Sequence, residues 1–352
     1  MIEEAAKQHD VLDKVFDTNE TLRLIDVRSP SEFAKGHIIG AHNIPLLNDE
    51  ERAEIGTLFK LDSPETGFLR GLDLVGPKMS HFVTAAAQYL GNEKGIVYCW
   101  RGGKRSNSMS WLFNMSGLHT QTIEGGYKAY RNRVQRLLEK HPCKMLVLGG
   151  KTGSGKTILL QKMQEKGEQI IDLEGLANHK GSAFGWIGEE TQPAVEHFEN
   201  MLAQTLSSLD AKRVVWIENE SRMIGRIPIY EKFWDRLKIS PVINIDIPTA
   251  VRVKHLSHIY NAENVDDLRE AFSRIKKRLG GVNVQNAMEA LNNNDLEKAA
   301  EIALLYYDKS YTKLLERNEA DPIYRLKFDN GDFDKIAAEL ITFKEQITVN
   351  AN

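Results

Sequence analysis

Met145-Leu-Val-Leu-Gly-Gly-Lys-Thr-Gly-Ser-Gly-Lys-Thr157 is the stretch that organises this chain of 352 residues. Its apolar start predicts a buried strand, and residues 158–165 predict a helix. The glycine-rich loop between them has the Walker A pattern, in which backbone N–H groups converge on phosphate oxygens. Lys156 would neutralise those oxygens, and Thr157 could ligate Mg²⁺. We therefore expect a diphosphate or triphosphate to bind at Gly150, Gly153, Ser154, Gly155, Lys156 and Thr157.

A Walker A loop needs an acidic partner at the end of a neighbouring strand. The predicted strand at residues 213–217 leads into Glu218 and Glu220, and either carboxylate could orient Mg²⁺ or water beside the phosphates. Aspartate is the usual residue at this place. The alternative is that both are surface carboxylates that pair with Arg222 or Arg226.

A polar, glycine-rich loop follows another predicted strand, at residues 169–172. Loops at strand ends carry specificity in open α/β sheets, so this loop is a candidate substrate loop. Its candidate ligands are Asn178, His179, Lys180 and Ser182. The alternative for His179 is an ordinary loop histidine. Three aromatic residues near this loop are expected in the core rather than in a pocket: Phe184, Trp186 and Phe198.

A second glycine-rich loop, Tyr98-Cys-Trp-Arg-Gly-Gly-Lys-Arg-Ser106, lies upstream. It joins a predicted strand at residues 95–98 to a predicted helix with Ser106 as its N-cap. Backbone N–H groups, the helix N-terminus and nearby cations would stabilise negative charge here and lower the pKa of the thiol. We therefore predict a catalytic group made of Cys99, Arg101 and Arg105. The alternative is a buried structural cysteine followed by an ordinary turn.

Composition sets broad limits on the function. Hydrophobic residues make up 41% of the chain and charged residues 27%, as in ordinary globular proteins. Two cysteines, Cys99 and Cys143, cannot form a disulfide framework, and no apolar run approaches the length of a membrane span. We expect a cytoplasmic protein that does not enter a membrane. A net charge of −3 gives no general sign of nucleic-acid binding, which would have to come from local patches.

The predicted elements divide the chain into three regions. Residues 1–140 alternate short strands and helices, which predicts a mostly parallel sheet. Its expected elements are strands at 22–27 and 95–98 and helices at 30–35, 77–90 and 125–139. A second α/β domain is expected over residues 144–248, with strands at 145–148, 169–172, 213–217 and 241–245 and a helix at 192–209. Residues 249–352 are expected to be mainly helical, with helices at 268–279, 284–291 and 296–317.

Local basic patches offer candidate contacts to nucleic acid. A helical stretch after Gly125 and another in the helical region are rich in cations, and an indole beside the reactive cysteine could stack on a base. The candidates are Trp100, Lys128, Arg131, Arg133, Lys276, Lys277 and Arg278. The alternative for each patch is an ordinary solvated helix face.

The first region resembles the rhodanese family. The resemblance rests on Asp26-Val-Arg-Ser-Pro-Ser-Glu-Phe-Ala-Lys-Gly-His37 together with the cysteine loop. Asp26, Arg28 and His37 are expected to be scaffolding. In sulfur-carrying rhodaneses the closing arginine usually follows the cysteine by five residues, whereas Arg105 follows Cys99 by six. The longer loop resembles that of rhodanese-related phosphatases, which favours a donor that contains phosphorus.

The combination of motifs is more specific than its parts. The cysteine loop, then Glu124-Gly-Gly-Tyr-Lys-Ala-Tyr-Arg131, the Walker A loop and Leu173-Glu-Gly-Leu-Ala-Asn-His-Lys-Gly-Ser-Ala-Phe-Gly185 resemble the tRNA 2-selenouridine synthase family. The resemblance implies a rhodanese-like domain followed by a P-loop domain with a helical extension. It also implies an enzyme that modifies uridine 34 of tRNAs carrying 2-thiouridine. The family first geranylates the sulfur with geranyl diphosphate, and then replaces the geranylthio group with selenium from selenophosphate.

The assignment of steps to sites follows from this resemblance. The P-loop would bind geranyl diphosphate, which needs no nucleobase pocket, and an enzyme that supplies selenophosphate would be a partner. Cys99 would either take selenium from selenophosphate or activate the geranylated carbon. Two other functions stay open: a P-loop protein that hydrolyses ATP or GTP and carries a sulfurtransferase or phosphatase domain, and a non-catalytic binding module.

Overall fold

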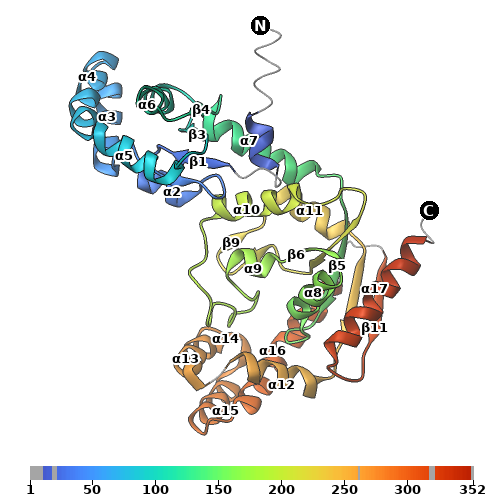
Figure 1. The fold of residues 1–352 in the computed structure, drawn as a ribbon. Helices are drawn as coiled ribbons and strands as arrows, with labels where there is room; N and C mark the ends of the chain where they lie inside the picture. Colours follow the sequence, from blue (N-terminus) through green and yellow to red (C-terminus); the bar gives the residue numbers. More distant parts are fainter. Residues whose placement is uncertain (1–10, 18–21, 261, 317–321, 350–352) are drawn as a thin grey trace. The chain divides into compact units, whose positions relative to one another are not determined.

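The computed structural model describes residues 11–17, 22–260, 262–316 and 322–349 (Figure 1). The chain forms two compact units. The first contains residues 1–140 and 194–208, and the second contains residues 141–193 and 209–352. Each unit has a parallel sheet with helices, so the predicted α/β architecture is confirmed.

The sheet of the first unit brings the candidate cysteine loop beside the rhodanese-like motif. Its strands lie in the order β2-β1-β3-β4 and all pair in parallel. They are β1 (Arg23–Asp26), β2 (His42–Asn43), β3 (Gly95–Tyr98) and β4 (Thr120–Thr122). Asp26 and Tyr98 are partners at the carboxyl ends of β1 and β3. The loop that begins with Cys99 therefore starts next to Asp26.

The helices of this unit pack around a core that includes Ile25, Val97, Cys99 and Phe113. They are α2 (Pro30–Lys35), α3 (Asp49–Leu61), α4 (Pro64–Val75), α5 (Met79–Leu90), α6 (Lys104–Met115) and α7 (Gly126–Lys140). A short 3₁₀ turn, η1 (Gly76–Lys78), precedes α5, so the helix predicted at 77–90 divides into two elements. Helices α3 and α4 were not among the predicted elements.

Helix α6 begins earlier than predicted. Its N-cap is Gly103 rather than Ser106, and its first residue is Lys104. Ser106 lies inside the helix, and its hydroxyl is 3.2 Å from both the Gly103 carbonyl oxygen and the Cys99 sulfur. The serine therefore belongs to the cysteine site, and the helix dipole begins three residues closer to the thiol than expected.

Helix α10 (Val195–Ser207) departs from the expected domain division, because it folds into the first unit although the sequence placed it in the P-loop domain. The helix buries Phe198, Leu202 and Leu206. Asn200, also fully buried, donates to the Tyr127 hydroxyl at 2.7 Å and to a backbone carbonyl, that of His37, at 2.9 Å. These long-range partners were invisible to local sequence patterns.

An Asn200→Ala variant should lose about 2–4 kcal/mol of unfolding free energy, because a buried phenol and a buried carbonyl lose their hydrogen-bond donor. The Arg131 guanidinium, which donates to Asn200 Oδ1 at 2.6 Å, loses an acceptor as well. Urea unfolding measures the difference. Gln204→Ala, a change at a partly buried position of the same helix, is the matched control. Equal midpoints and slopes for both variants would show that Asn200 does not hold α10 in place.

The sheet of the second unit has the strand order β11-β10-β5-β7-β6, and all its pairs are parallel. The strands are β5 (Lys144–Gly150), β6 (Gln169–Ile171), β7 (Val214–Glu218), β10 (Val242–Asp246) and β11 (Ile323–Lys327). A two-stranded hairpin, β8 (Met223–Ile224) with β9 (Ile227–Pro228), lies outside this sheet. Strand β11 was missed in the region expected to be helical. Its alternating pattern, with Tyr324 and Leu326 packed on the core, was the available signal.

The helices of the second unit lie between its strands in the chain, and α17 follows the last strand. They are α8 (Lys156–Glu165), α9 (Leu173–Ala177), α11 (Glu231–Ile239), α12 (Thr249–Ile259), α13 (Val265–Arg274), α14 (Lys276–Leu279), α15 (Gly281–Asn292), α16 (Leu296–Glu316) and α17 (Phe333–Val349), with a 3₁₀ turn, η2 (Ala262–Asn264). The helix predicted at 296–317 corresponds to α16, and Arg317 lies outside the described residues. None of the helices in the described part of the chain is both long and apolar enough to cross a membrane.

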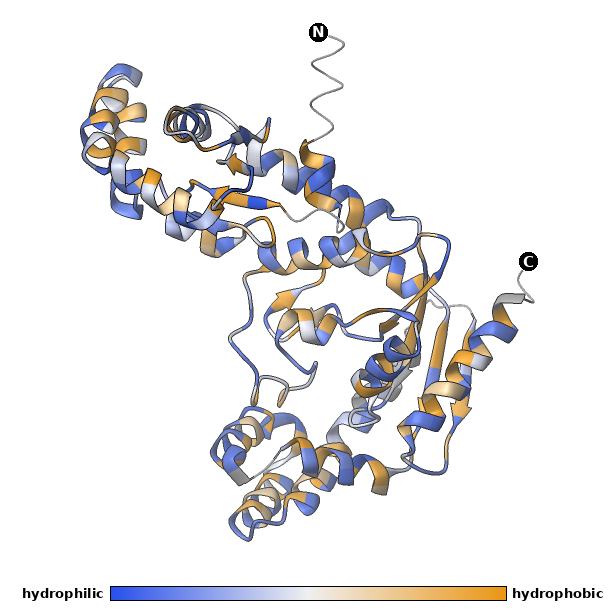
Figure 2. Cartoon of the chain, viewed as in Figure 1, coloured by the Kyte–Doolittle hydropathy of each residue, from blue (hydrophilic) through white to orange (hydrophobic). Residues whose placement is uncertain are grey.

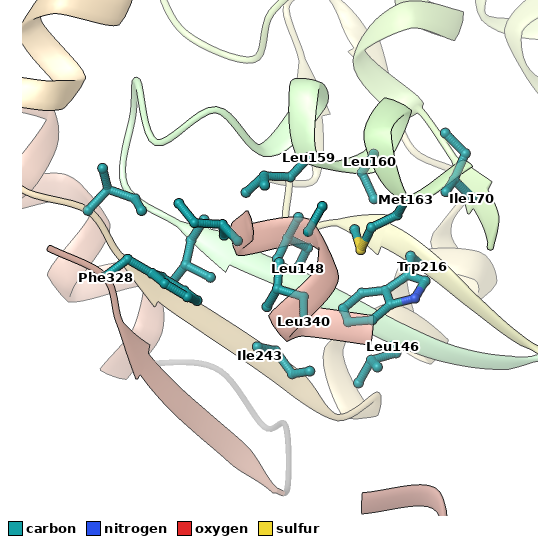
Figure 3. Close-up of a cluster of buried hydrophobic side chains, with 14 residues drawn as sticks. Leu146, Leu148, Leu159, Leu160, Met163, Ile170, Trp216, Ile243, Phe328 and Leu340 are labelled. Carbon is teal, nitrogen blue, oxygen red and sulfur yellow. The ribbon is translucent and has the colours of Figure 1, made fainter. Parts of the chain in front are cut away.

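The main core of this unit joins the sheet to helices at opposite ends of its sequence. Figure 3 shows Leu148 of β5, Met163 of α8, Trp216 of β7 and Leu340 of α17 directed toward one another. In Figure 2 the strands are mainly hydrophobic, whereas α8 and α17 carry residues of both kinds, as amphipathic helices do. Helix α17 therefore belongs to the P-loop sheet and is not part of a separate extension.

Candidate functional site: a thiol loop and a P-loop

The Cys99 sulfur lies in a cup of hydrogen-bond donors. The side chain is 4% exposed, Gly103 N–H donates to the sulfur at 3.4 Å, and the Ser106 hydroxyl lies 3.2 Å from it. Burial raises the pKa of the thiol, but hydrogen bonds from the Ser106 hydroxyl and from the N–H groups of Gly103, Ser106 and Arg101 outweigh burial. The pKa of Cys99 is therefore lowered, and the thiolate is favoured.

The turn before α7 holds the cysteine loop in place. Gly126 has φ +56°, and a Cβ at this position would lie 2.2 Å from the Cys99 carbonyl oxygen. The first N–H groups of α7 cap the loop: Tyr127 donates to the Cys99 carbonyl and Lys128 to the Trp100 carbonyl, both at 2.9 Å. The glycine pair in Glu124-Gly-Gly-Tyr is thus required by a close backbone contact.

The cations predicted around the thiol differ in their exposure and in their partners. Arg101 is exposed, as is Lys104, whose ammonium lies 5.1 Å from the centre of the Phe68 ring. Arg105 instead donates to Glu32 at 2.8 Å and is only 23% exposed. The catalytic role of Arg105 stays a prediction: its guanidinium is paired with a carboxylate, and the Gly103 N–H group contacts the sulfur.

The rhodanese-like motif forms a buried support beneath this loop. Arg28 donates to Asp26 at 2.6 Å and to a backbone carbonyl, that of Gly36, at 2.7 Å, and its guanidinium lies 3.8 Å from the centre of the Tyr127 ring. His37 hydrogen-bonds through Nδ1 to the Phe33 carbonyl at 3.0 Å. These contacts are those of scaffolding residues.

The P-loop has the backbone that phosphate binding requires. Gly155 has φ +76°, and α8 begins at the next residue, so the loop ends at a helix N-terminus. Lys156 Nζ donates to the Gly150 carbonyl at 3.3 Å. The Ser154 hydroxyl is buried and has no hydrogen-bond partner among the described residues. An arriving phosphate oxygen could satisfy both groups.

Three carboxylates surround the P-loop lysine. Glu218 at the end of β7 is 1% exposed, and its Oε1 accepts from Glu174 N–H at 2.7 Å. The Thr157 hydroxyl donates to Glu174 at 3.0 Å, so Glu174, which we did not predict as a site residue, joins the site. Because β6 and β7 are parallel neighbours, the residues after both strands meet at one edge of the sheet, and this brings Glu174 to the P-loop. Burial lowers the pKa of Lys156, but the carboxylates, with Glu220 the largest, raise it overall.

The residues around Thr157 fit a Mg²⁺ ion bound together with a diphosphate. Burial, followed by neighbouring carboxylates, raises the pKa of Glu218 well above its usual value, and Glu218 Oε2 has no partner among the described residues. Across the described part of the chain, no group of three or more His, Cys, Asp or Glu side chains is arranged to hold a metal. Ligand oxygens from the diphosphate would therefore be needed beside Thr157 and Glu218.

Diphosphate affinity should fall as the pH rises through about 8. Burial, with Glu174 next, raises the pKa of Glu220 to about 8, so this carboxyl is neutral below that pH and adds a negative charge beside the anion above it. Glu220→Gln stays neutral and should not show this loss, so the ratio of wild-type to variant Kd should rise roughly tenfold between pH 7 and pH 9. Calorimetric titration with inorganic diphosphate, without divalent cations, measures it. A constant ratio would place Glu220 outside the anion site.

The predicted substrate loop lies over these carboxylates. Gly181 has φ +68°, and a Cβ there would lie 2.5 Å from Glu220 Oε2. Burial lowers the pKa of His179, which is 7% exposed, so this histidine is neutral. Lys180 pairs with Glu189 at 2.5 Å rather than pointing into the P-loop. The remaining candidates have local hydrogen bonds: Asn178 donates to the Thr191 carbonyl at 3.2 Å, and the Ser182 hydroxyl accepts from Phe184 N–H at 3.1 Å.

The three aromatic residues near this loop have different environments. Phe184 is 5% exposed and packs edge-on against Phe272 of α13, with ring centres 5.0 Å apart. Trp186 is partly buried beneath Arg274, whose guanidinium lies 5.0 Å from its ring centre. Phe198 is fully buried on α10, in the first unit. The substrate loop thus anchors itself to the helices through Phe184.

Only some of the predicted nucleic-acid contacts are available at the surface. The Arg131 side chain is 12% exposed and is bound by Glu199, Asn200 and the Glu196 carbonyl of α10. Arg133 lies 3.7 Å from Asp13 and is 42% exposed. The residues with exposed side chains are Lys128, Lys276, Lys277 and Arg278, the last of which donates to the Tyr306 hydroxyl at 3.1 Å. Trp100 is partly buried against Tyr127.

Comparisons with known proteins match both units. Residues 143–339 match the family described as tRNA 2-selenouridine synthase AAA domain, and residues 8–133 match the Rhodanese-like domain. A protein of Bdellovibrio bacteriovorus named tRNA 2-selenouridine synthase is 36% identical, covering 90% of this chain and 94% of the relative. Proteins of the same name from Sulfurovum sp. and Nitrosomonas europaea are 36% and 33% identical, each covering 86% of this chain and 91% of the relative.

Proposed function

This chain belongs to the tRNA 2-selenouridine synthase family, and from this premise we propose that it converts 2-thiouridine 34 of tRNA into 2-selenouridine in two steps, at two sites. The observation that carries the proposal is a pair of loops rich in hydrogen-bond donors, one in each compact unit, of which the Cys99 loop holds a thiol and the P-loop does not. The P-loop, which has no thiol, is suited to stabilising the diphosphate that leaves in the first step. The Cys99 loop, which has a thiolate, is suited to a step with a covalent intermediate.

The first step is geranyl transfer at the P-loop. The sulfur of 2-thiouridine attacks C1 of geranyl diphosphate, a C–S bond forms, the C–O bond breaks and diphosphate leaves, while the base loses its N3 proton to solvent. Lys156 and the N–H groups from Gly153 to Thr157 would stabilise the charge on the leaving diphosphate. Thr157 and Glu218 would hold Mg²⁺, which neutralises the leaving diphosphate further.

The second step replaces the geranylthio group at the Cys99 loop. A thiolate that removed selenium from selenophosphate as a neutral atom would leave phosphorus two electrons more reduced than in phosphate. Attack of the Cys99 thiolate on phosphorus avoids this: an S–P bond forms, the Se–P bond breaks, and selenium leaves as hydrogen selenide. Hydrogen selenide then adds to C2 of the base, geranylthiol leaves, and water releases phosphate from Cys99. The cup of N–H groups and the long loop support attack at a tetrahedral phosphorus centre.

The proposal is tested with tRNA that carries 2-thiouridine. The wild-type protein is incubated with this tRNA and geranyl diphosphate without any nucleotide, and nucleosides are then examined by mass spectrometry. We expect the geranylated nucleoside, followed by 2-selenouridine when selenophosphate is added. Absence of the geranyl adduct together with tRNA-independent hydrolysis of ATP or GTP would overturn the proposal in favour of a nucleotide-hydrolysing protein.

A further inference from the structure

A pocket that is partly open to solvent lies beside the P-loop within the second unit. Thr152 of the P-loop and Ser182 of the substrate loop contribute to its wall, together with apolar residues of α12, α13 and α16. We call this cavity the tail pocket. It adjoins the phosphate site but takes no part in the chemistry described above.

The walls of the tail pocket are almost entirely apolar. Leu268, Phe272, Leu296 and Ala303 are among its lining residues. Its two tyrosine hydroxyls are already engaged with the substrate loop: Tyr307 accepts from Ala183 N–H at 2.8 Å, and Tyr260 donates to the Phe184 carbonyl at 3.3 Å. A nucleobase placed here would leave its ring nitrogens and carbonyls without partners, which is costly, whereas a hydrocarbon chain would not.

The tail pocket extends along helix α16, away from the P-loop. Asp308 near one end of this lining stretch pairs with Arg252 at 2.8 Å and lies 4.0 Å from Lys151 of the P-loop. From Tyr307 the lining residues continue toward the helix N-terminus at Leu304, Ala303, Ala300, Ala299 and Leu296. This spacing is one face of a helix, and the 12 residues from Asp308 to Leu296 correspond to about 18 Å. The pocket therefore extends from the phosphate site along an apolar stripe.

We propose that the tail pocket binds the prenyl chain of the diphosphate held at the P-loop, and that the three alanines of α16 determine the longest chain accepted. This inference rests on the proposed function, because it requires a prenyl diphosphate at the P-loop. The alanines Ala299, Ala300 and Ala303 have no side chain beyond Cβ, so they leave space between α16 and the opposite wall, which includes Leu268 and Phe272. A larger side chain at any of these positions would shorten the space for the chain.

The test measures binding and transfer separately. Ala300 is partly buried and lines the tail pocket, and Ala300→Phe should fill it. We expect this variant to bind geranyl diphosphate at least about tenfold more weakly in calorimetric titration, with an equal or larger loss in transfer kcat/KM. Its affinity for inorganic diphosphate and its transfer from dimethylallyl diphosphate should be unchanged. Leu305→Phe, on the same helix at a 56% exposed position outside the pocket, is the control and should bind geranyl diphosphate like the wild type.

A change in the opposite direction keeps the inference falsifiable if Ala300→Phe folds poorly. Leu296→Ala removes bulk at the far end of the stripe and should raise transfer from farnesyl diphosphate relative to geranyl diphosphate at least about tenfold. Unchanged chain-length preference in a folded variant would overturn the inference, as would equal geranyl diphosphate affinity for Ala300→Phe and Leu305→Phe. Failure of the wild-type protein to transfer any prenyl group would instead overturn the proposed function, and the titrations would still report on the pocket.

Discussion

A Cys99→Ala variant should geranylate 2-thiouridine tRNA as the wild type does, yet form 2-selenouridine at least about a thousandfold more slowly. The variant keeps the P-loop, Lys156 and the carboxylates, which belong to the other unit. It loses the thiolate that the donor cup stabilises. Mass spectrometry of nucleosides from one reaction reports both steps, because the geranylated intermediate should accumulate.

Cys143→Ala is the matched control for this experiment. Cys143 is also free, but it is 5% exposed and burial raises the pKa of its thiol, so it lacks the donor cup of Cys99. This variant should form 2-selenouridine normally. Loss of both steps in Cys99→Ala with a normal unfolding curve would contradict the division of chemistry between the two loops. A phosphorus NMR signal from phosphocysteine in the wild type, absent in Cys99→Ala, would support attack at phosphorus.

Lys156→Ala should reduce geranyl transfer at least about a hundredfold. The ammonium is the cation expected at the diphosphate, and it also offsets the carboxylates Glu220, Glu174 and Glu218. Without it, an anionic substrate meets only negative side chains at that position, so binding and leaving-group stabilisation are both lost. Geranyl transfer from geranyl diphosphate is measured by mass spectrometry of the nucleosides.

Supplying the geranylated intermediate shows whether Lys156→Ala loses only the geranyl-transfer step or both steps. Supplied with tRNA that is already geranylated, Lys156→Ala should still insert selenium from selenophosphate, because the Cys99 loop is intact. Lys166→Ala, an exposed lysine just after the C-terminus of the same helix, should behave as the wild type in both steps. Normal geranylation by Lys156→Ala would move the diphosphate site away from the P-loop.

Sequence patterns predicted the features that depend on residues close together in the sequence. The strand at Gly95–Tyr98, the strand before the P-loop and the helix at Pro30–Lys35 all follow from local apolar spacing and from glycine or proline positions. The charges around Cys99 and Lys156 were also visible. A sequence shows that a charge exists, however, and not which partner binds it. Arg105 and Arg131 looked available for anions, and each is bound by a carboxylate distant in sequence.

Long-range pairing explains what was missed. Glu174 joins the P-loop because β6 and β7, which are separated by 42 residues of the chain, are neighbours in the sheet. Such pairings leave little local signal. Strand β11 also pairs with a strand far upstream, β10, although its own alternating pattern was a local signal. The tail pocket depends on the packing of three helices and a loop, so a list of apolar residues could not locate it.

Because helix α10 belongs to the first unit, we expect recombination to transfer the rhodanese-like half between proteins poorly. The chain passes between the units at residues 140–141, 193–194 and 208–209, so no single cut releases either unit intact. A gene fragment ending at residue 140 would lack the helix that packs on α7, and Tyr127 would lose its buried partner, Asn200. Recombination at the apparent boundary should therefore give aggregating products, and the two halves should be inherited as one piece.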